Sequence, residues 1–197
     1  MPQDPNDEPA SALLQRINPK AQTIPDNEVY GEVPEGWCVT KLGNAAKYTN
    51  GRAFKPEEWQ TIGLPIIRIQ NLNDPAATYN RSPKQYEKKY LIKDGDLLFA
   101  WAASLGTYIW NGGEAWLNQH IFKVQPQDFV EKCFLYYAFQ SMITEFYRNC
   151  HGSGMVHITK KQFEEIPLYL PPLPEQRRIV EKIERLFAQL DNIEANL

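Results

Sequence analysis

Polar side chains that can read the edges of DNA bases interrupt or border three apolar stretches of this sequence. The stretches are NGRAFKPEEW (50–59), RIQNLND (68–74) and WLNQHIFKV (116–124). Arginine pairs bidentately with guanine, and asparagine or glutamine matches the donor and acceptor pair of adenine. Ordinary turn chemistry explains the same residue types equally well. Asn118, Gln119 and His120 are harder to explain as a turn, because three adjacent polar residues in an apolar run place at least one on a buried face.

A fourth segment, HGSGMVHITKK (151–161), combines flexible glycines, a serine, two histidines and paired lysines. This composition suits close approach to a phosphate backbone, since glycine lets the main chain come near and lysine supplies charge. It fits a plain helix-to-strand connection equally well. His120, His151 and His157 follow no ligand spacing rule, so we expect no metal site.

Sequence signatures of enzymes are missing. The chain has no GxGxxG or GxxxxGK[ST] loop, no GxSxG, no HExxH, and no (D/N)PP(Y/F) to hold an extruded adenine. PDNE (25–28) is similar to an acidic nuclease motif, but it lies in a polar linker and no catalytic lysine follows it. We therefore expect no catalytic residues and no cofactor.

Charge is spread unevenly along the chain, whose formal net charge is −3. Residues 1–36 carry two basic and seven acidic side chains, residues 37–165 carry fifteen and twelve, and residues 166–197 carry four and five. The middle is thus basic by only three charges, which is far from the footprint of a strong non-specific DNA binder. Any DNA contact must therefore depend on local patches and base readout.

Composition predicts one good-sized domain with an appendage. The 197 residues are 43% hydrophobic and 12% aromatic, which is ample for a packed core. No apolar run reaches eighteen residues and the amino terminus is acidic and Pro-rich, so we predict a cytoplasmic protein. Cys38, Cys133 and Cys150 share no CxxC spacing and are expected to be reduced thiols.

Hydrophobic periodicity predicts an α+β fold. Residues 8–17 have the pattern of a short helix, and 128–149 that of one amphipathic helix. Short apolar runs bounded by turn residues predict strands that begin near Trp37 and continue at 64–72, 95–101, 107–110, 115–124 and 166–170. Thr159 is a suitable N-cap for a short helical turn, and Pro174 suits the first turn of a last helix.

That last helix, within PPLPEQRRIVEKIERLFAQLDNIEANL (171–197), carries an apolar seam with alternating spacings of four and three, typical of a coiled coil. The seam residues are Ile179, Ile183, Leu186, Leu190, Ile193 and Leu197. Packing of the helix on its own domain is the alternative, because Val180 and Phe187 add apolar surface. A helix of about 24 residues spans roughly 36 Å, close to one turn of B-DNA, and would suit a spacer.

IPLYLPPLPEQRRIVEKIERLFAQLD (166–191) closely resembles the conserved spacer region of specificity subunits of type I restriction-modification systems. Other segments resemble the same family in the expected order: VPEGWCVTKLG, GLPIIRIQNLN, DGDLLFAW, LNQH and GSGMVHITKKQFEEIPL. The resemblance covers nearly everything from Val33 to Leu197. QDPNDEPASALLQRI (3–17) is similar to the segment between a spacer helix and the next recognition domain.

The resemblance implies a non-catalytic, sequence-specific DNA recognition subunit. Residues 1–32 would be the end of a preceding spacer, 33–170 a target recognition domain with a twisted, mostly antiparallel sheet and packed helices, and 171–197 a truncated, projecting spacer helix. The domain would read one half of a bipartite site in double-stranded DNA. Implied partners are S-adenosylmethionine-dependent modification (methyltransferase) subunits, a restriction subunit with ATP-driven translocase and nuclease activity, and a second spacer helix or a second copy of the chain.

Within this family the recognition surface varies on a constant framework, so the DNA sequence that is read cannot be predicted. We expect the DNA face to include Arg52, Lys55, Arg68, Gln70, Asn71, Gln119, Ser153, His157, Lys160 and Lys161. The first six would lie nearer the bases, and the two lysines nearer phosphates.

Two alternatives remain open. The chain has one recognition domain and one spacer helix where a full subunit has two of each, so it is either a half-size subunit that pairs with itself or a fragment. The amino-terminal likeness favours the fragment, whose seam would then lack its natural partner. A coiled-coil protein–protein adaptor without DNA binding is the rival from another class, consistent with the acidic total charge, and an enzyme comes third.

Overall fold

The computed structural model describes residues 4–25, 31–74, 76–149 and 157–196. The chain forms two compact units and passes between them four times. Unit 1 consists of the chain up to Ala45, Pro126–Tyr137, and the chain from Glu164 onward, and unit 2 of Ala46–Gln125 and Ala138–Phe163. Among the helices of the described residues, none has the length and apolar character needed to cross a membrane.

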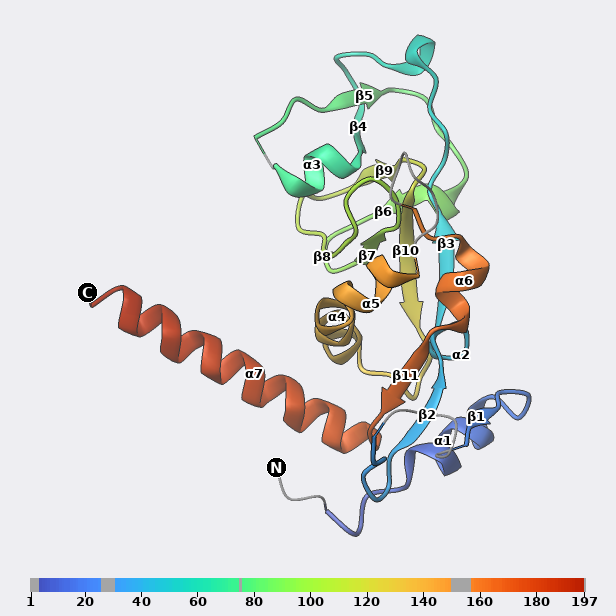
Figure 1. Ribbon diagram of the computed structural model, residues 1–197. Helices are drawn as coiled ribbons and strands as arrows, with labels where there is room; N and C mark the ends of the chain where they lie inside the picture. The colour runs from blue at the N-terminus through green and yellow to red at the C-terminus, as the bar shows by residue number, and fades with distance from the viewer. Residues whose placement is uncertain (1–3, 26–30, 75, 150–156, 197) are drawn as a thin grey trace. The chain divides into compact units, whose positions relative to one another are not determined.

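Unit 1 is built on a three-stranded antiparallel sheet in the order β1-β2-β11 (Figure 1). The central strand β2 (Cys38–Lys41) pairs with β1 (Thr23–Ile24) on one side and with β11 (Pro167–Leu170) on the other. Helix α1 (Ala10–Ile17) buries one apolar face in this unit, and the short α2 (Leu42–Ala45) directly follows β2. The sheet thus joins the two ends of the sequence.

Helix α7 (Leu173–Glu194) is anchored in unit 1 by a fully buried glutamine. The Gln176 amide donates to the carbonyls of Phe129 (3.0 Å) and Pro171 (2.9 Å), and its oxygen accepts from the Glu131 N–H (2.7 Å). One side chain therefore satisfies three backbone groups from two separate segments.

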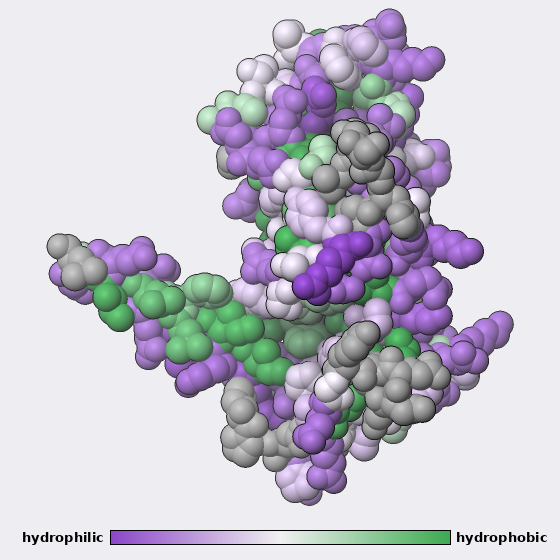
Figure 2. Space-filling view, viewed as in Figure 1, coloured by the Kyte–Doolittle hydropathy of each residue, from purple (hydrophilic) through white to green (hydrophobic). Residues whose placement is uncertain are grey.

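The second half of α7 exposes an apolar stripe, visible as a green run along this helix in Figure 2. Leu186, Leu190 and Ile193 are 45%, 54% and 57% exposed. Phe187 is half-exposed and stacks on Tyr137, with ring centroids 6.3 Å apart. The apolar surface on this half of the helix is far from covered.

The first half of α7 differs from the second. Val180 is buried, and Ile179 and Ile183 are half-buried. Both predicted environments of the helix are therefore present, with packing on its own unit near the start and an open apolar face near the end. Pro174 lies in the first turn, as predicted, and Leu197 lies outside the described residues.

Unit 2 contains two four-stranded sheets, in the orders β3-β10-β7-β8 and β5-β4-β9-β6. Their strands are β3 (Ala46–Asn50), β4 (Leu64–Ile67), β5 (Asn80–Ser82), β6 (Leu91–Ile92), β7 (Leu97–Ala100), β8 (Gly106–Ile109), β9 (Ala115–Leu117) and β10 (Ile121–Pro126). β7 pairs antiparallel with β10 and β8, while β4 and β9 run parallel between antiparallel neighbours.

The helices and 3₁₀ turns that complete the fold lie between or beside these strands (Figure 1). They are η2 (Pro56–Glu58), α3 (Ile69–Asn73), η3 (Lys88–Tyr90), α4 (Lys132–Ser141), α5 (Ile143–Arg148) and α6 (Lys160–Glu165).

Phe99 of β7 centres an aromatic core in unit 2. Its ring lies 5.4 Å from Phe139, 4.9 Å from Phe146 and 4.7 Å from Phe163, measured between centroids. All four rings are buried, and such tilted and edge-on pairs add about 0.5–1.5 kcal/mol each beyond the burial of their area. The core therefore joins the β3-β10-β7-β8 sheet to the later segment of the unit.

The α+β, mostly antiparallel fold is confirmed, but its strands form three sheets instead of one. The predicted single helix at 128–149 is wrong, because the chain leaves helical geometry at Met142 and α5 begins there. The predicted strand at 64–72 ends at Ile67 and turns into α3, and 115–124 is two strands joined by a turn.

The Thr159 cap is confirmed. Its hydroxyl accepts from the Gln162 N–H, and the Gln162 side chain accepts from the Thr159 N–H in return. The predicted domain boundaries after residues 32 and 170 remain a prediction. The two compact units divide the chain differently, because unit 1 contains both its first and its last segment.

Replacing Gln176 by Ala should lower the free energy of unfolding by about 2–4 kcal/mol, because it leaves one N–H and two carbonyls buried without partners. Urea denaturation followed by tryptophan fluorescence measures the loss. Gln189→Ala, an exposed glutamine of the same helix, is the control and should stay within about 0.5 kcal/mol. Equal stability of the two variants would contradict the anchoring role.

Candidate nucleic-acid interface

Three turns of unit 2 enclose an open hollow of about 450 Å³, here called the three-turn hollow. It is lined by Arg68, Ile69, Gln70 and Asn73 after β4, by Ala103 and Ser104 after β7, and by Asn118, Gln119 and His120 between β9 and β10. The residues from 68–74 and 116–124 that sequence analysis singled out as base readers thus meet in one place.

The β9–β10 turn is fixed by backbone hydrogen bonds to other segments. The Asn118 N–H donates to the carbonyl of Ile67 at the end of β4 (3.1 Å), and the Gln119 N–H donates to the carbonyl of Arg52 (2.9 Å). The carbonyl of His120 accepts from the N–H of Trp101, the residue after β7, at 3.0 Å. The turn therefore holds its side chains on a rigid backbone.

Gly51 permits the closest of these approaches. Its N–H donates to Ile121 (3.0 Å), and the next residue, Arg52, donates to Leu117 (2.9 Å). A Cβ added at position 51 would lie 2.0 Å from the carbonyl oxygen of Asn118, a distance that no side chain tolerates. Only glycine lets residues 50–52 lie against the turn in this geometry.

Both left-handed non-glycine residues of the described chain lie in the lining of the hollow, as do two of the four buried side-chain polar atoms that have no partner among the described residues. His120 and Ala103 have left-handed φ values of 71° and 59°, a conformation that costs a non-glycine residue about 1–2 kcal/mol. Asn118 Oδ1 and His120 Nδ1 are buried without a hydrogen-bond partner among the described residues. Each such atom costs about 1–3 kcal/mol. Features of this kind cluster at functional sites, where a ligand supplies what the fold leaves unmet.

The His120 ring meets Trp101 edge-on, with centroids 4.8 Å apart. Burial lowers the pKa of His120 below its usual value, because the charged imidazolium is poorly hydrated there. The ring is therefore neutral at pH 7 and offers one donor and one acceptor. It suits a base edge better than a phosphate.

Arg52 is already engaged within the protein. Its guanidinium pairs bidentately with Glu58 (2.8 Å for both bonds) and lies 4.9 Å from the Phe54 ring and 4.4 Å from the Tyr86 ring. These hydrogen bonds lower the pKa of Glu58 to about 2. Arg52 therefore orients residues 50–52 in this conformation, while Lys55 is exposed and its N–H binds the same carboxylate.

The three predicted residues near α3 have different environments. Arg68 lines the hollow with its guanidinium 5.2 Å from the Trp59 ring centre. Gln70 is exposed on the hollow. Asn71 is only 2% exposed, and its amide accepts from the Arg68 N–H and donates to Ala77 and Thr78. Asn71 thus shapes the loop and has no surface to offer a base in this conformation.

The remaining predicted residues lie before and within α6. His157 bridges to Ala102, next to the turn after β7. Lys160 and Lys161 are exposed at the start of α6, and the Lys160 ammonium donates to the Tyr48 carbonyl. Ser153 lies outside the described residues.

Sequence reasoning missed Asn73, Ala103 and Ser104 in the lining. Asn73 stood within RIQNLND, but nothing marked it apart from its neighbours. Ala103 and Ser104 lie in a stretch without a functional motif, and the residue type alanine gives no sign of a left-handed backbone. Asn118 and His120 were singled out by their placement in an apolar run, and the structure confirms that both have buried polar atoms.

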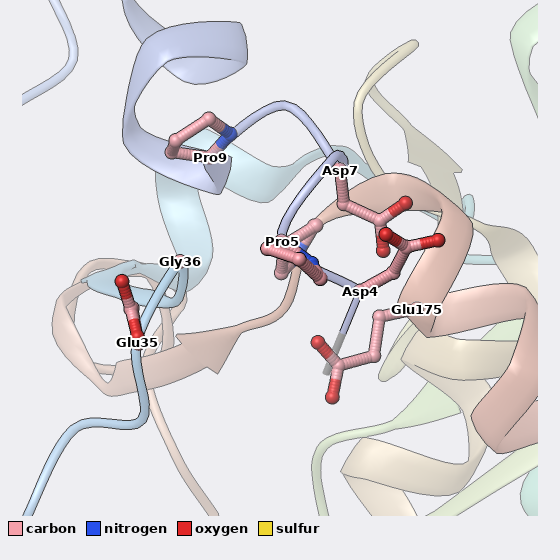
Figure 3. A pocket seen from close by; sticks show the side chains of 8 residues that line it. Asp4, Pro5, Asp7, Pro9, Glu35, Gly36 and Glu175 are labelled. Atoms are coloured by element: carbon pink, nitrogen blue, oxygen red, sulfur yellow. The ribbon is translucent and has the colours of Figure 1, made fainter. Parts of the chain in front are cut away.

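Unit 1 has a second hollow, of about 350 Å³, between the first residues of the chain and the start of α7 (Figure 3). Asp4 and Asp7 point their carboxylates toward each other in Figure 3, whereas the Glu175 carboxylate points away from them and Glu35 lies on the other side of the hollow. Asp7 pairs with Arg178. Across the part of the chain that the structure describes, no three His, Cys, Asp or Glu side chains form a group that could hold a metal ion. This hollow is where the amino-terminal segment docks.

Comparison with known proteins decides the family. The family model described as "Type I restriction modification DNA specificity domain" matches residues 34–197. The chain belongs to this family. The match includes every residue of the three-turn hollow, so the hollow is a feature of a DNA specificity domain.

Curated relatives carry the same description. The chain is 31% identical to the specificity subunit of type I restriction enzyme EcoBI from Escherichia coli, over 84% of this chain and 35% of that subunit. It is 32% identical to the EcoAI specificity subunit of the same species, over 95% of this chain and 37% of that subunit. The chain therefore spans little more than a third of the length of these relatives.

A solved structure shows the same fold. The HsdS subunit from Thermoanaerobacter tengcongensis superposes with a TM-score of 0.67 at 22% identity, covering 95% of this chain and 45% of that one.

Gly51→Ala should lower the free energy of unfolding by about 2–4 kcal/mol, since the new methyl group displaces the β9–β10 turn. Gly113→Ala is the control. It introduces a methyl group at φ 78° with no atom within 4 Å, so only the strain of about 1–2 kcal/mol applies. Urea unfolding of both variants separates crowding from strain. A Gly51→Ala protein as stable as the Gly113→Ala protein would show that the turn can move freely.

Proposed function

We propose that this specificity domain reads one half of a bipartite DNA sequence, with the three-turn hollow as the base-reading centre. The observation that carries the proposal is the meeting of several amide side chains, an arginine and a neutral histidine in one hollow of a DNA specificity domain. These groups match the hydrogen-bonding edges that bases present in the major groove.

The proposed DNA face follows the predicted residues, with roles refined by their environments. Lys55, Arg68, Gln70 and Gln119 act nearer the bases, and Lys160 and Lys161 nearer the phosphates. Ser153 and His157 complete the predicted DNA face. Arg52 and Asn71 act by positioning, because their polar groups bind other parts of the protein. Residues 33–170 remain the proposed recognition domain, between the end of one spacer (1–32) and the start of another (171–197).

The wider assembly is also a proposal. Modification subunits that methylate adenine, and a restriction subunit, would dock on the specificity domain, which itself catalyses nothing. In this proposal the protein works in the cytoplasm, beside the DNA. The exposed stripe of α7 would pair with a second spacer helix, either from the same subunit or from a second copy of the chain.

A coiled-coil adaptor without DNA binding is the rival function. The exposed stripe on α7 supports it, and the modest basic surplus does not oppose it. An adaptor function does not explain why residues with strained backbones and unpaired polar atoms line a hollow in unit 2. We therefore favour DNA recognition.

The experiment is selection from a randomised duplex library at two salt concentrations, with the chain alone and with a type I modification subunit. Enrichment of a short motif establishes a specificity domain. Lys160→Ala with Lys161→Ala should weaken binding to all sequences alike. The same double variant should make the salt dependence shallower, by up to about one unit for each phosphate that a lysine no longer neutralises.

Lys182→Ala, an exposed lysine of α7, is the matched control and should leave retention unchanged. Retention without sequence preference, or none even with the modification subunit, would favour the adaptor. Unchanged binding of the double variant would contradict the phosphate role of the two lysines.

The pairing of α7 has its own prediction. Leu190→Asp should abolish self-association of the chain, or its binding to a synthetic spacer helix, because a carboxylate replaces a side chain at the centre of the seam. Sedimentation equilibrium measures the change. Asn192→Asp places the same charge on an exposed residue of the helix away from the seam and should leave association intact. Loss in both variants would show that charge on the helix, and not the seam, controls pairing.

A further inference from the structure

We infer that the three-turn hollow reads the major-groove edge of a single A·T base pair, with the Gln119 amide on the adenine and the Ala103 methyl group against the thymine methyl. This inference rests on the proposed function and adds to it the identity of one base pair.

The amide side chains of the hollow favour adenine. Four of its residues carry amides, which match the donor and acceptor pair of adenine, and no carboxylate, the usual partner of the cytosine amino group, lines it. Arg68, the residue type that pairs with guanine, lies with its guanidinium 5.2 Å from the Trp59 ring centre. Of the four amides, Asn73 accepts from the Tyr108 hydroxyl (2.6 Å), and the Asn118 oxygen is buried. The exposed amides are those of Gln70 and Gln119.

Gln119 is the better placed of these two. Backbone hydrogen bonds to other segments hold Gln119 and the residues on either side of it. Among the described residues the Gln119 side-chain amide forms no hydrogen bond that DNA binding would have to break. A bidentate pair with adenine N6 and N7 requires both atoms of the amide to be held at a defined angle. A rigid turn supplies that angle, and only the rotamers of one side chain must then be ordered.

Asn118 Oδ1 and His120 Nδ1, on either side of Gln119, are buried without a hydrogen-bond partner among the described residues. They mark this turn as a place where the fold leaves polar groups unmet. They do not select the base, because the amino group and N7 of adenine are both used by the Gln119 amide.

A methyl group completes the base pair. Ala103, in the turn after β7, is exposed and lines the same hollow as Gln119. Thymine alone presents a methyl group in the major groove, and alanine is a usual contact for it. An A·T pair thus offers a partner to both Gln119 and Ala103.

A flipped-out base fits less well. Sites for extruded bases hold them between aromatic or apolar faces. The lining contains a single ring, that of His120, and this ring meets Trp101 edge-on. The hollow is open on the surface of the unit, which suits contact with an intact duplex.

The test begins with the motif enriched by the wild-type chain, with a modification subunit present where retention requires it. Each base pair of the motif is then replaced in turn, and binding is measured. At one A·T position, replacement by G·C should weaken wild-type binding about tenfold or more. For Gln119→Ala, all four base pairs at that position should bind within about threefold, while preference elsewhere in the motif persists.

A second measurement isolates the hydrogen bond. 7-Deazaadenine at the same position removes the N7 acceptor and should weaken wild-type binding several-fold, but it should not change binding by Gln119→Ala. Gln85→Ala, an exposed glutamine elsewhere in unit 2, is the matched control and should behave like the wild type in both measurements. Urea unfolding confirms that the Gln119→Ala protein is folded.

The outcomes separate this inference from the proposed function. If the wild type enriches no motif, the proposed function fails. If it enriches a motif but Gln119→Ala keeps every preference, or loses preference at a G·C pair, the assignment of an A·T pair to Gln119 is overturned and the specificity domain stands. An equal effect of 7-deazaadenine on both proteins would likewise overturn it.

Discussion

The contact between Gly51 and the carbonyl of Asn118 governs the geometry of the whole three-turn hollow. With no Cβ at position 51, the segment 50–52 lies close enough to exchange backbone hydrogen bonds with both sides of the β9–β10 turn. The pair of Arg52 with Glu58, packed by Phe54 and Tyr86, then holds that segment in place. The left-handed conformation of His120 persists because its surroundings determine it from several directions.

Unit 1 uses buried polar groups in a different way. Gln176 satisfies backbone groups of segments far apart in the sequence, and Trp37 donates to the buried Glu175 at 3.1 Å. Both contacts fix the start of α7 without covering its far end. Rigidity at the base of the helix and apolar exposure beyond it are what a spacer needs in order to hold a partner helix at a defined angle.

Much of this could be predicted from the sequence, and the failures have physical reasons. Alternation of apolar residues located the strands, and the heptad spacing located the seam of α7, because both are local patterns. The break at Met142 carries no glycine or proline, so only packing reveals it. The sequence predicted that Arg68, Gln70 and Gln119 belong to one DNA face, but it did not predict that they line a single hollow. The roles of Arg52 and Asn71 depended on Glu58 and on Ala77 and Thr78, partners that no spacing rule could supply.

The path of the chain between the two units also limits how new specificities can arise. Unit 2 comes from two separate segments, 46–125 and 138–163, and the Phe99 ring of the first packs against Phe139, Phe146 and Phe163 of the second. A genetic exchange that moved only the first segment between relatives would pair a new sheet with an old set of aromatic rings. Recombination that preserves this packing therefore carries both segments together with the unit 1 stretch between them, so the inherited module is longer than the segments that line the three-turn hollow.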